Sequence, residues 1–113
     1  DQAVGVVITG TNGADAVVQS ATNYDTDGSP ATVTLGAFTS SGNATYGTFS
    51  NSGVDTFTVG SGFTSVSFTT RMLSEYKSTS DTTVDCTFLG ATEVLGIAIE
   101  IKTLPEGIIN FEI

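Results

Sequence analysis

The side chains able to do chemistry in this sequence are mostly carboxylates and hydroxyls. The 113 residues include 12 Asp and Glu, three Lys and Arg, and no His. Without His, general acid–base chemistry would fall to carboxylates, Tyr or Lys, and a pair of carboxylates can hydrolyse glycosides. The acidic residues lie in predicted turns or on predicted solvent faces, where no raised pKa is expected. The serines have no basic partner and no Gly-x-Ser-x-Gly motif occurs, so we predict that the chain is not an enzyme.

The best candidate for a cation site is the turn sequence Asp25-Thr26-Asp27-Gly28-Ser29. Alternate carboxylates followed by Gly are typical of the start of a calcium loop, because Ca²⁺ binds several oxygens around a tight turn. The later ligands of an EF-hand loop are missing, and a solvated Asx turn would account for the same residues. Asp25 and Asp27 are therefore the predicted calcium ligands, and no other cofactor is predicted.

A neutral glycan is the other small ligand that the sequence allows. Carbohydrate sites commonly offer an aromatic platform beside polar groups, and in a chain without Trp that platform would be a Tyr. Tyr24, beside the two aspartates, is the best exposed candidate. Asn43-Ala44-Thr45 is the single N-glycosylation sequon. In a chain so rich in Asn, Ser and Thr, chance is the alternative explanation for that sequon.

The charge balance excludes several classes of partner. The formal charge is −9 and the isoelectric point is near 4.1. Binding a phosphate backbone requires clustered Lys and Arg, whereas this chain has only Arg71, Lys77 and Lys102. We therefore expect no nucleic acid and no anionic membrane as partners. No apolar run reaches the roughly 18 residues of a membrane-spanning helix, so no membrane span is predicted, and the start at Asp1 rather than Met indicates a processed or excised form.

Turn-forming residues recur about every ten residues, a spacing typical of a β-sandwich or barrel. Between them lie β-branched and aromatic runs of alternating polarity. The expected strands cover residues 3–9, 16–21, 31–38, 45–49, 63–70, 71–78, 82–88, 93–102 and 108–113. Helix-like spacing occurs at Met72, Leu73 and Tyr76, but Ser- and Thr-rich flanks favour a strand there. The predicted fold class is all-β, a single antiparallel β-sandwich domain over residues 1–113.

Segment 93–102 is apolar on both faces, which is typical of a central strand that is covered on both sides. Its small residues Gly96 and Ala98 leave room for a second layer to approach closely. In segment 45–49, by contrast, Tyr46 and Phe49 do not share a strand face, and this predicts a bulge or a twist.

The single cysteine, Cys86, excludes an internal disulfide. It shares strand parity with Val84 and Phe88, which predicts a buried thiol that behaves as a small hydrophobe. An intermolecular disulfide or a reactive thiol is the alternative.

Six stretches of turn and core residues carry a resemblance to a known group of proteins. They are VQSATN at 18–23, TVTL at 32–35, GNATYG at 42–47, TVGSGFT at 58–64, EYK at 75–77 and GIAIEIK at 96–102. In this order they resemble jelly-roll-like β-sandwich modules of bacterial secreted and surface proteins and of some phage structural proteins. The resemblance implies a jelly-roll-like fold and an extracellular, cell-surface or virion location, and it carries over no catalytic or binding residues. In those modules these stretches belong to the later half of a longer sandwich, so the earlier strands would be missing here.

An incomplete sandwich would leave open strand edges that accept a strand from another chain. Segment 108–113 lies beyond the usual end of such modules and is the expected donor, with residues near the other end as second choice. The predicted interface residues are Ile109, Phe111 and Ile113, then Val4, Val6 and Ile8.

The leading functional hypothesis is a homo-oligomeric structural subunit of an extracellular or virion assembly, such as a filament, built by strand exchange. Pairing of segment 108–113 within its own sheet is the structural alternative. A second hypothesis is a cell-surface adhesion module that binds a glycan or Ca²⁺.

Overall fold

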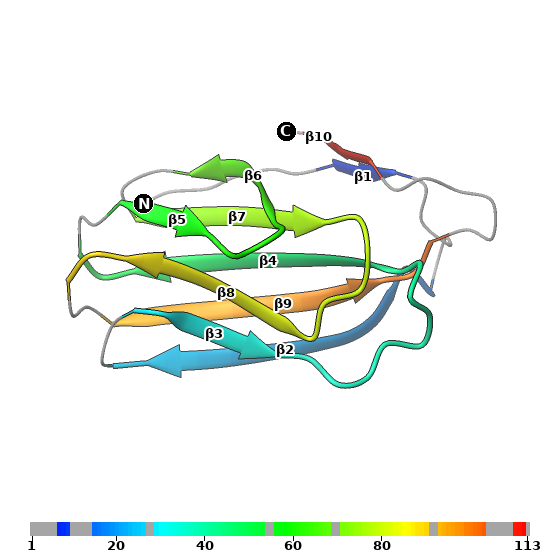
Figure 1. Ribbon diagram of the computed structural model, residues 1–113, viewed down its shortest axis with the longest axis horizontal. Helices are drawn as coiled ribbons and strands as arrows, with labels where there is room; N and C mark the ends of the chain where they lie inside the picture. Colours follow the sequence, from blue (N-terminus) through cyan, green and yellow to red (C-terminus); the bar gives the residue numbers. More distant parts are fainter. Residues whose placement is uncertain are drawn as a thin grey trace.

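A computed structural model describes residues 7–9, 15–26, 29–53, 56–68, 71–90, 93–103 and 110–112 of the chain. Within these ranges there are ten β-strands and no α-helix (Figure 1). The strands are β1 (Val7–Thr9), β2 (Val17–Asp25), β3 (Ala31–Thr34), β4 (Ala44–Asn51), β5 (Phe57–Val59), β6 (Thr64–Phe68), β7 (Met72–Lys77), β8 (Thr83–Phe88), β9 (Val94–Ile101) and β10 (Asn110–Glu112). No helix in the described part of the chain is long and apolar enough to cross a membrane.

Strands β2 to β9 form two antiparallel sheets that pack face to face. One sheet has five strands in the order β2-β9-β4-β7-β6, and the other has three in the order β3-β8-β5. Every connection between consecutive strands crosses from one sheet to the other, except the β6–β7 hairpin. Eight strands wound in this way form a jelly roll, with β6 pairing to β7 in the larger sheet. The predicted all-β antiparallel sandwich is confirmed.

The absence of earlier strands, which the resemblance implies, stays a prediction. The described residues supply all eight strands of the two-sheet sandwich, beginning with β2. Strand β2 extends to Asp25 and is longer than predicted, while the short strand β5 was not predicted at all.

The core lies between the two sheets and is built by alternation along each strand, since successive side chains point to opposite faces. Its buried apolar side chains come from both layers: Ala31, Val33, Leu35, Phe49, Phe57, Phe63, Leu73, Val84, Cys86, Phe88, Val94 and Ala98. The predicted inward orientation of Cys86 is confirmed.

Two glycines set the distance between the sheets. A Cβ on Gly96 would lie 2.7 Å from Val33 Cγ2 and 2.8 Å from the Phe49 ring, and a Cβ on Gly47 would collide with Val84. Only a residue without a side chain allows this approach. The prediction that Gly96 leaves room for a second layer is confirmed.

Strand β9 lies in the interior of the five-stranded sheet, between β2 and β4, as its apolar sequence predicted. The prediction that both of its faces are covered is wrong for part of its length, because Leu95 and Ile97 are exposed. The predicted bulge near Tyr46 and Phe49 is also absent, since β4 pairs in regular register with both neighbours. Phe49 points into the core and Tyr46 points outward.

The two terminal strands, β1 and β10, form a separate two-stranded ribbon (Figure 1). They pair antiparallel, with Ile8 opposite Phe111. The last described strand therefore pairs within its own chain, although not with an edge of either sandwich sheet. Val4, Val6, Ile109 and Ile113 lie outside the described residues.

Replacing Gly96 with Ala should destabilise the fold, because the new methyl group overlaps two rigid side chains. The expected loss is about 1 to 3 kcal/mol of unfolding free energy, measured by urea denaturation. Gly42→Ala is the matched control, since a Cβ there meets Ser40 Oγ at an ordinary 3.7 Å. Equal midpoints for the two variants would contradict the close packing at Gly96.

Candidate functional site

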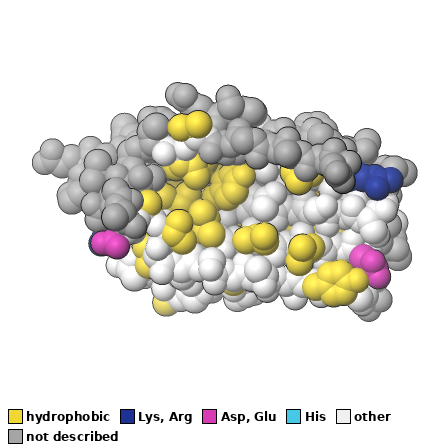
Figure 2. Space-filling view, turned by 180° about the vertical axis from the view of Figure 1, so that it is seen from behind, with side chains coloured by type: hydrophobic (Ala, Val, Ile, Leu, Met, Phe, Trp, Pro, Cys, Tyr) yellow, Lys and Arg dark blue, Asp and Glu magenta, His cyan; other side chains and the backbone are white. Residues whose placement is uncertain are grey.

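The outer face of the five-stranded sheet, which points away from the smaller sheet, carries no charged side chain on the described residues of β2, β9, β4 and β7. Strand register places its residues in rows across the sheet. The rows are Tyr24–Leu95–Ser50–Met72, Thr22–Ile97–Thr48–Ser74, Ser20–Ile99–Tyr46–Tyr76 and Val17–Ile101–Ala44. Seen from behind, this side shows apolar and uncharged polar side chains, with charged groups at its margins (Figure 2).

The terminal ribbon covers one end of the outer face. The Phe111 ring stacks on Tyr76, with a 4.2 Å distance between centroids, and on Tyr46 at 5.9 Å. Ile8 from β1 packs with them against the buried pair Ala44 and Ile101. Two of the predicted interface residues, Ile8 and Phe111, therefore lie together, and both are in contact with their own sheet.

The other end of the outer face is open. Tyr24, Leu95 and Ile97 are 57%, 49% and 42% exposed, and we call these three residues the free patch. At its margin, a hydrogen bond to Glu93 raises the pKa of Tyr24. The predicted exposure of Tyr24 is confirmed, while its role toward a glycan stays a prediction.

The structure places Tyr24 and Asp25, one of the two predicted calcium ligands, on different faces of the sheet. Asp25 pairs with Val94, whose side chain points inward, so Tyr24 and Asp25 lie on opposite faces of β2. Asn23 Nδ2 donates to Asp25 Oδ2 at 3.3 Å, and Asp27 lies outside the described residues. No cluster of three or more potential metal ligands occurs within the described ranges. The calcium site stays a prediction without a described set of ligands.

Glu100 is a fully buried carboxylate on the inner face of β9. Its Oε1 accepts hydrogen bonds from Asn43 Nδ2 at 2.7 Å and from the backbone N–H and hydroxyl of Thr39, both at 3.0 Å. Its Oε2 accepts one from Gln19 Nε2 at 2.7 Å. Burial opposes ionisation, but these four donors together lower the pKa of Glu100. The carboxylate thereby fixes the β3–β4 connection to the sheet.

Asn43 belongs to this network, which argues against its predicted glycosylation. Its side chain is buried. Besides Glu100, its Nδ2 donates to Thr39 Oγ1 at 3.0 Å, and its Oδ1 accepts from Thr103 N at 3.3 Å. A glycan on Nδ2 would remove the short bond to Glu100 and could not be accommodated in the folded chain.

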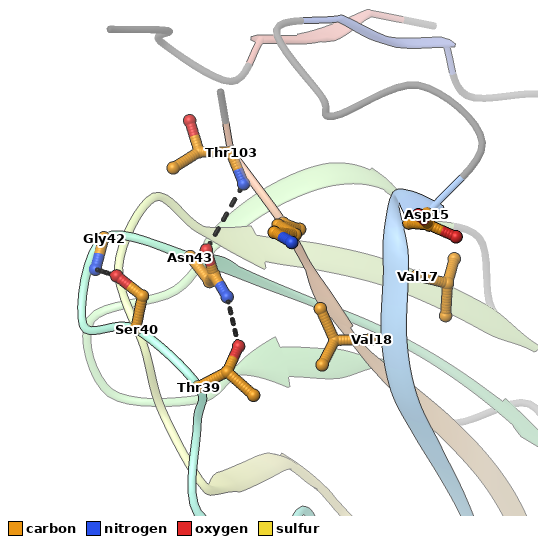
Figure 3. Close-up of a pocket in the computed structure, with 9 residues that line it drawn as sticks. Asp15, Val17, Val18, Thr39, Ser40, Gly42, Asn43 and Thr103 are labelled. Atoms are coloured by element: carbon orange, nitrogen blue, oxygen red, sulfur yellow. Dashed lines mark hydrogen bonds between the residues drawn. The ribbon is translucent and has the colours of Figure 1, made fainter. Parts of the chain in front are cut away.

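A cavity of about 850 Å³ opens beside this network at the end of the sandwich (Figure 3). Val17 and Val18 of β2 form one wall and the loop containing Ser40 forms another. Its charged groups, Asp15 and Lys102, are exposed, whereas catalytic groups are typically desolvated. The rest of the cavity lining is formed mainly by hydroxyl and apolar side chains.

Glu75, on the inner face of β7, is the second fully buried carboxylate. Its Oε2 accepts a hydrogen bond from Gly60 N at 3.0 Å, and its Oε1 has no partner. Burial raises the pKa of Glu75 to about 7, and the negative charges of Asp85 and Asp81 raise it further. The hydrogen bond from Gly60 acts in the opposite direction but does not offset these effects. The nearby Lys77 is paired with Asp81 at 2.9 Å.

The expectation that all carboxylates are solvated is therefore wrong for Glu75 and Glu100. Strand parity contains the signal that was missed, because Glu100 follows Gly96 and Ala98 at intervals of two, and Glu75 follows Leu73. Cys86 lies close to the same region, and burial together with the charge of Glu75 raises the pKa of its thiol. The thiol is thus buried and protonated in the folded state, as is expected of a small hydrophobic core residue.

No protein-family model, curated protein or solved structure matches this chain.

Replacing Glu100 with Gln should destabilise the fold by about 2 to 3 kcal/mol, since charge-assisted hydrogen bonds are lost and an amide N–H₂ faces buried donors. Urea denaturation at neutral pH measures this change. Asp15→Asn removes an exposed carboxylate at the same end of the molecule and should leave the midpoint unchanged. A similar midpoint for the two variants would show that the network contributes little.

Glu75 should make the fold less stable as the pH rises toward neutrality. Its folded pKa of about 7 lies above the ordinary value of 4.5, so its contribution is fully present below pH 4.5 and is lost as the pH rises through 7. The expected loss is on the order of 3 kcal/mol, measured as unfolding free energy across this range. Glu75→Gln, which mimics the protonated form, should remove most of this dependence, and an unchanged pH profile in that variant would refute the assignment.

Proposed function

We propose that this chain is a non-catalytic structural subunit of an extracellular or virion assembly, such as a filament, whose copies are joined by exchange of the terminal strands. The observation that carries this proposal is the separate β1–β10 ribbon, which attaches to the sandwich through a small aromatic and aliphatic cluster. Its two strands do not extend either sandwich sheet.

The ribbon depends on its contacts with the outer face for stability. Each strand has three residues, and an isolated two-stranded ribbon is at best marginally stable in water. Stacking of Phe111 on Tyr46 and Tyr76, with the packing of Ile8, supplies the missing stabilisation. The same contacts would form equally well with a strand from a neighbouring copy, which is the condition for exchange between identical chains.

The absence of catalytic chemistry is supported by the position of the two buried carboxylates. Glu100 accepts four hydrogen bonds, and both it and Glu75 are closed off from solvent. A general acid or base must reach a substrate directly or through one water molecule. These two groups are placed to hold connections of the fold and not to meet a substrate.

A second candidate function is a surface module that binds a neutral glycan on the outer face. The exposed Tyr24 ring favours it, with the hydroxyl of Thr22 on the same strand face and that of Ser50 across Leu95 in the same row. Jelly rolls occur in lectin domains as well as in viral capsids, although fold alone does not decide between these functions.

Strand exchange can be trapped by a cysteine pair across the ribbon. Val7 and Glu112 are opposite each other in the β1–β10 register, so Val7→Cys/Glu112→Cys should form disulfide-linked oligomers when oxidised at high protein concentration. Denaturing electrophoresis without reductant separates these from chains closed on themselves. The native Cys86 is buried and does not compete.

The two single-cysteine variants serve as controls, since neither can form a chain of linked copies. A ladder of covalent species in the double variant supports exchange. Covalently closed monomers alone, at every protein concentration, would refute it.

A further inference from the structure

Strands β5 and β6, together with the turn between them, form one edge of the sandwich (Figure 1). Within the described ranges, β5 pairs only with β8 in the smaller sheet, and β6 pairs only with β7 in the larger sheet. The β6–β7 ladder is also irregular between Ser65 and Ser67. We call residues 57–68 the edge segment. It can leave both sheets as one unit while β7 stays paired with β4 and β8 with β3.

Two buried side chains lie beneath the edge segment, one from each sheet. Glu75 of β7 accepts a hydrogen bond on Oε2 from Gly60 N in the turn, at 3.0 Å, and its Oε1 has no partner. Cys86 of β8 is fully buried and lies opposite Val59 of β5. Burial and the charge of Glu75 both raise the pKa of the Cys86 thiol, so the two groups lie close together in one dry region.

We propose that ionisation of Glu75 opens the edge segment and thereby exposes the thiol of Cys86 to solvent. The edge is sealed in acid and opens more often as the pH approaches neutrality. This device does not depend on the proposed strand exchange, because the terminal ribbon packs on the outer face of the larger sheet whereas Glu75 points inward.

The groups around Glu75 disfavour its charged form while the edge is closed. Asp85 of β8 and Asp81 of the β7–β8 connection are both negative and both raise its pKa. Lys77, the nearby cation, is paired with Asp81 at 2.9 Å. The remaining titratable group is the protonated thiol of Cys86, and strands β4, β5 and β6 contain no charged residue. A buried carboxylate with one donor and two negative neighbours is stabilised when water reaches it.

The contacts of the edge segment keep the closed state favoured but are few. Phe57 and Phe63 are buried, Phe63 N donates to Gly60 O at 3.0 Å, and the Lys77 ammonium lies 5.8 Å from the centroid of the Phe63 ring. Short strands that pair on one side only belong to the least stable parts of a fold. Local opening here therefore requires less free energy than unfolding of the whole sandwich.

The direction of the pH effect follows from the two protonation equilibria. In the closed state the pKa of Glu75 is about 7, and in the open, hydrated state it returns toward 4.5. The closed state therefore holds the proton more tightly. Its advantage is fully present below pH 4.5 and is lost as the pH rises through 7.

The native thiol reports the opening directly. The full chain is treated with 4,4′-dithiodipyridine from about pH 5 to about pH 8, and the labelling rate of Cys86 is divided by that of the urea-unfolded chain at the same pH. This ratio measures the open fraction, which should rise by roughly tenfold or more across the range. In Glu75→Gln, which circular dichroism verifies as folded, the ratio should stay nearly constant. A flat ratio in the unmodified chain, or an equal rise in Glu75→Gln, would overturn the proposal.

Asp85→Asn is a second variant that keeps the Glu75 carboxylate. It removes one of the negative charges that raise the pKa of Glu75, so the midpoint of the rise should move to lower pH. An unchanged midpoint would assign the rise to another group and would overturn the proposal.

Urea separates local opening from unfolding of the whole chain. At neutral pH, labelling of Cys86 should be nearly independent of urea well below the unfolding midpoint, because local opening exposes little surface. Val33→Cys/Cys86→Ala is the matched control, since Val33 is buried on β3, on the other side of β8 from the edge segment. Its labelling should accelerate steeply with urea. The same steep dependence at Cys86 would overturn local opening, while the pH dependence of global stability assigned to Glu75 would stand.

Discussion

The approach of the two sheets at Gly47 and Gly96 is the constraint on which the rest of the structure depends. Both glycines lie in interior strands of the larger sheet, opposite Val84 and Val33 of the smaller one. Close packing here buries the middle of the inner face, where a polar group is costly unless it finds a partner within the protein. The two carboxylates are buried because they occupy inward-pointing positions of their strands, toward the ends of the sandwich, where the sheets pack this closely.

The two buried carboxylates accept hydrogen bonds from the connections between the two sheets. These connections cross from one sheet to the other, and their backbone N–H groups cannot all join a strand ladder. Glu100 accepts the N–H of Thr39 in the β3–β4 connection, and Glu75 accepts the N–H of Gly60 between β5 and β6. The difference lies in the number of donors, since Glu100 is fully satisfied whereas one oxygen of Glu75 has none. The hydrogen bonds to Glu100 therefore stabilise its own charged form. Glu75, whose pKa is raised to about 7, makes the stability of the fold depend on pH near neutrality.

Much of this architecture follows from patterns of one or two residues. Alternation in β8 and the small residues of β9 correctly predicted a sandwich with its layers close together at Gly96, and Cys86 was correctly placed inside. Local patterns fail where the partner is distant in sequence. The burial of Glu100 depends on Gln19, Thr39 and Asn43, which lie 81, 61 and 57 residues away, so strand parity can place its side chain inward but cannot identify the donors that bind it there.

The predicted bulge at Tyr46 is absent for the same reason, because the residue that covers Tyr46 is distant in sequence. This residue packs on the outer face of the larger sheet. An aromatic residue on each side of β4 suggested irregular backbone, because only one covered face was expected. Tyr46 is instead covered by Phe111, a contact that spans most of the chain. The outer face of the larger sheet therefore also carries apolar side chains. The terminal ribbon covers only part of this face, and Leu95 and Ile97 stay exposed.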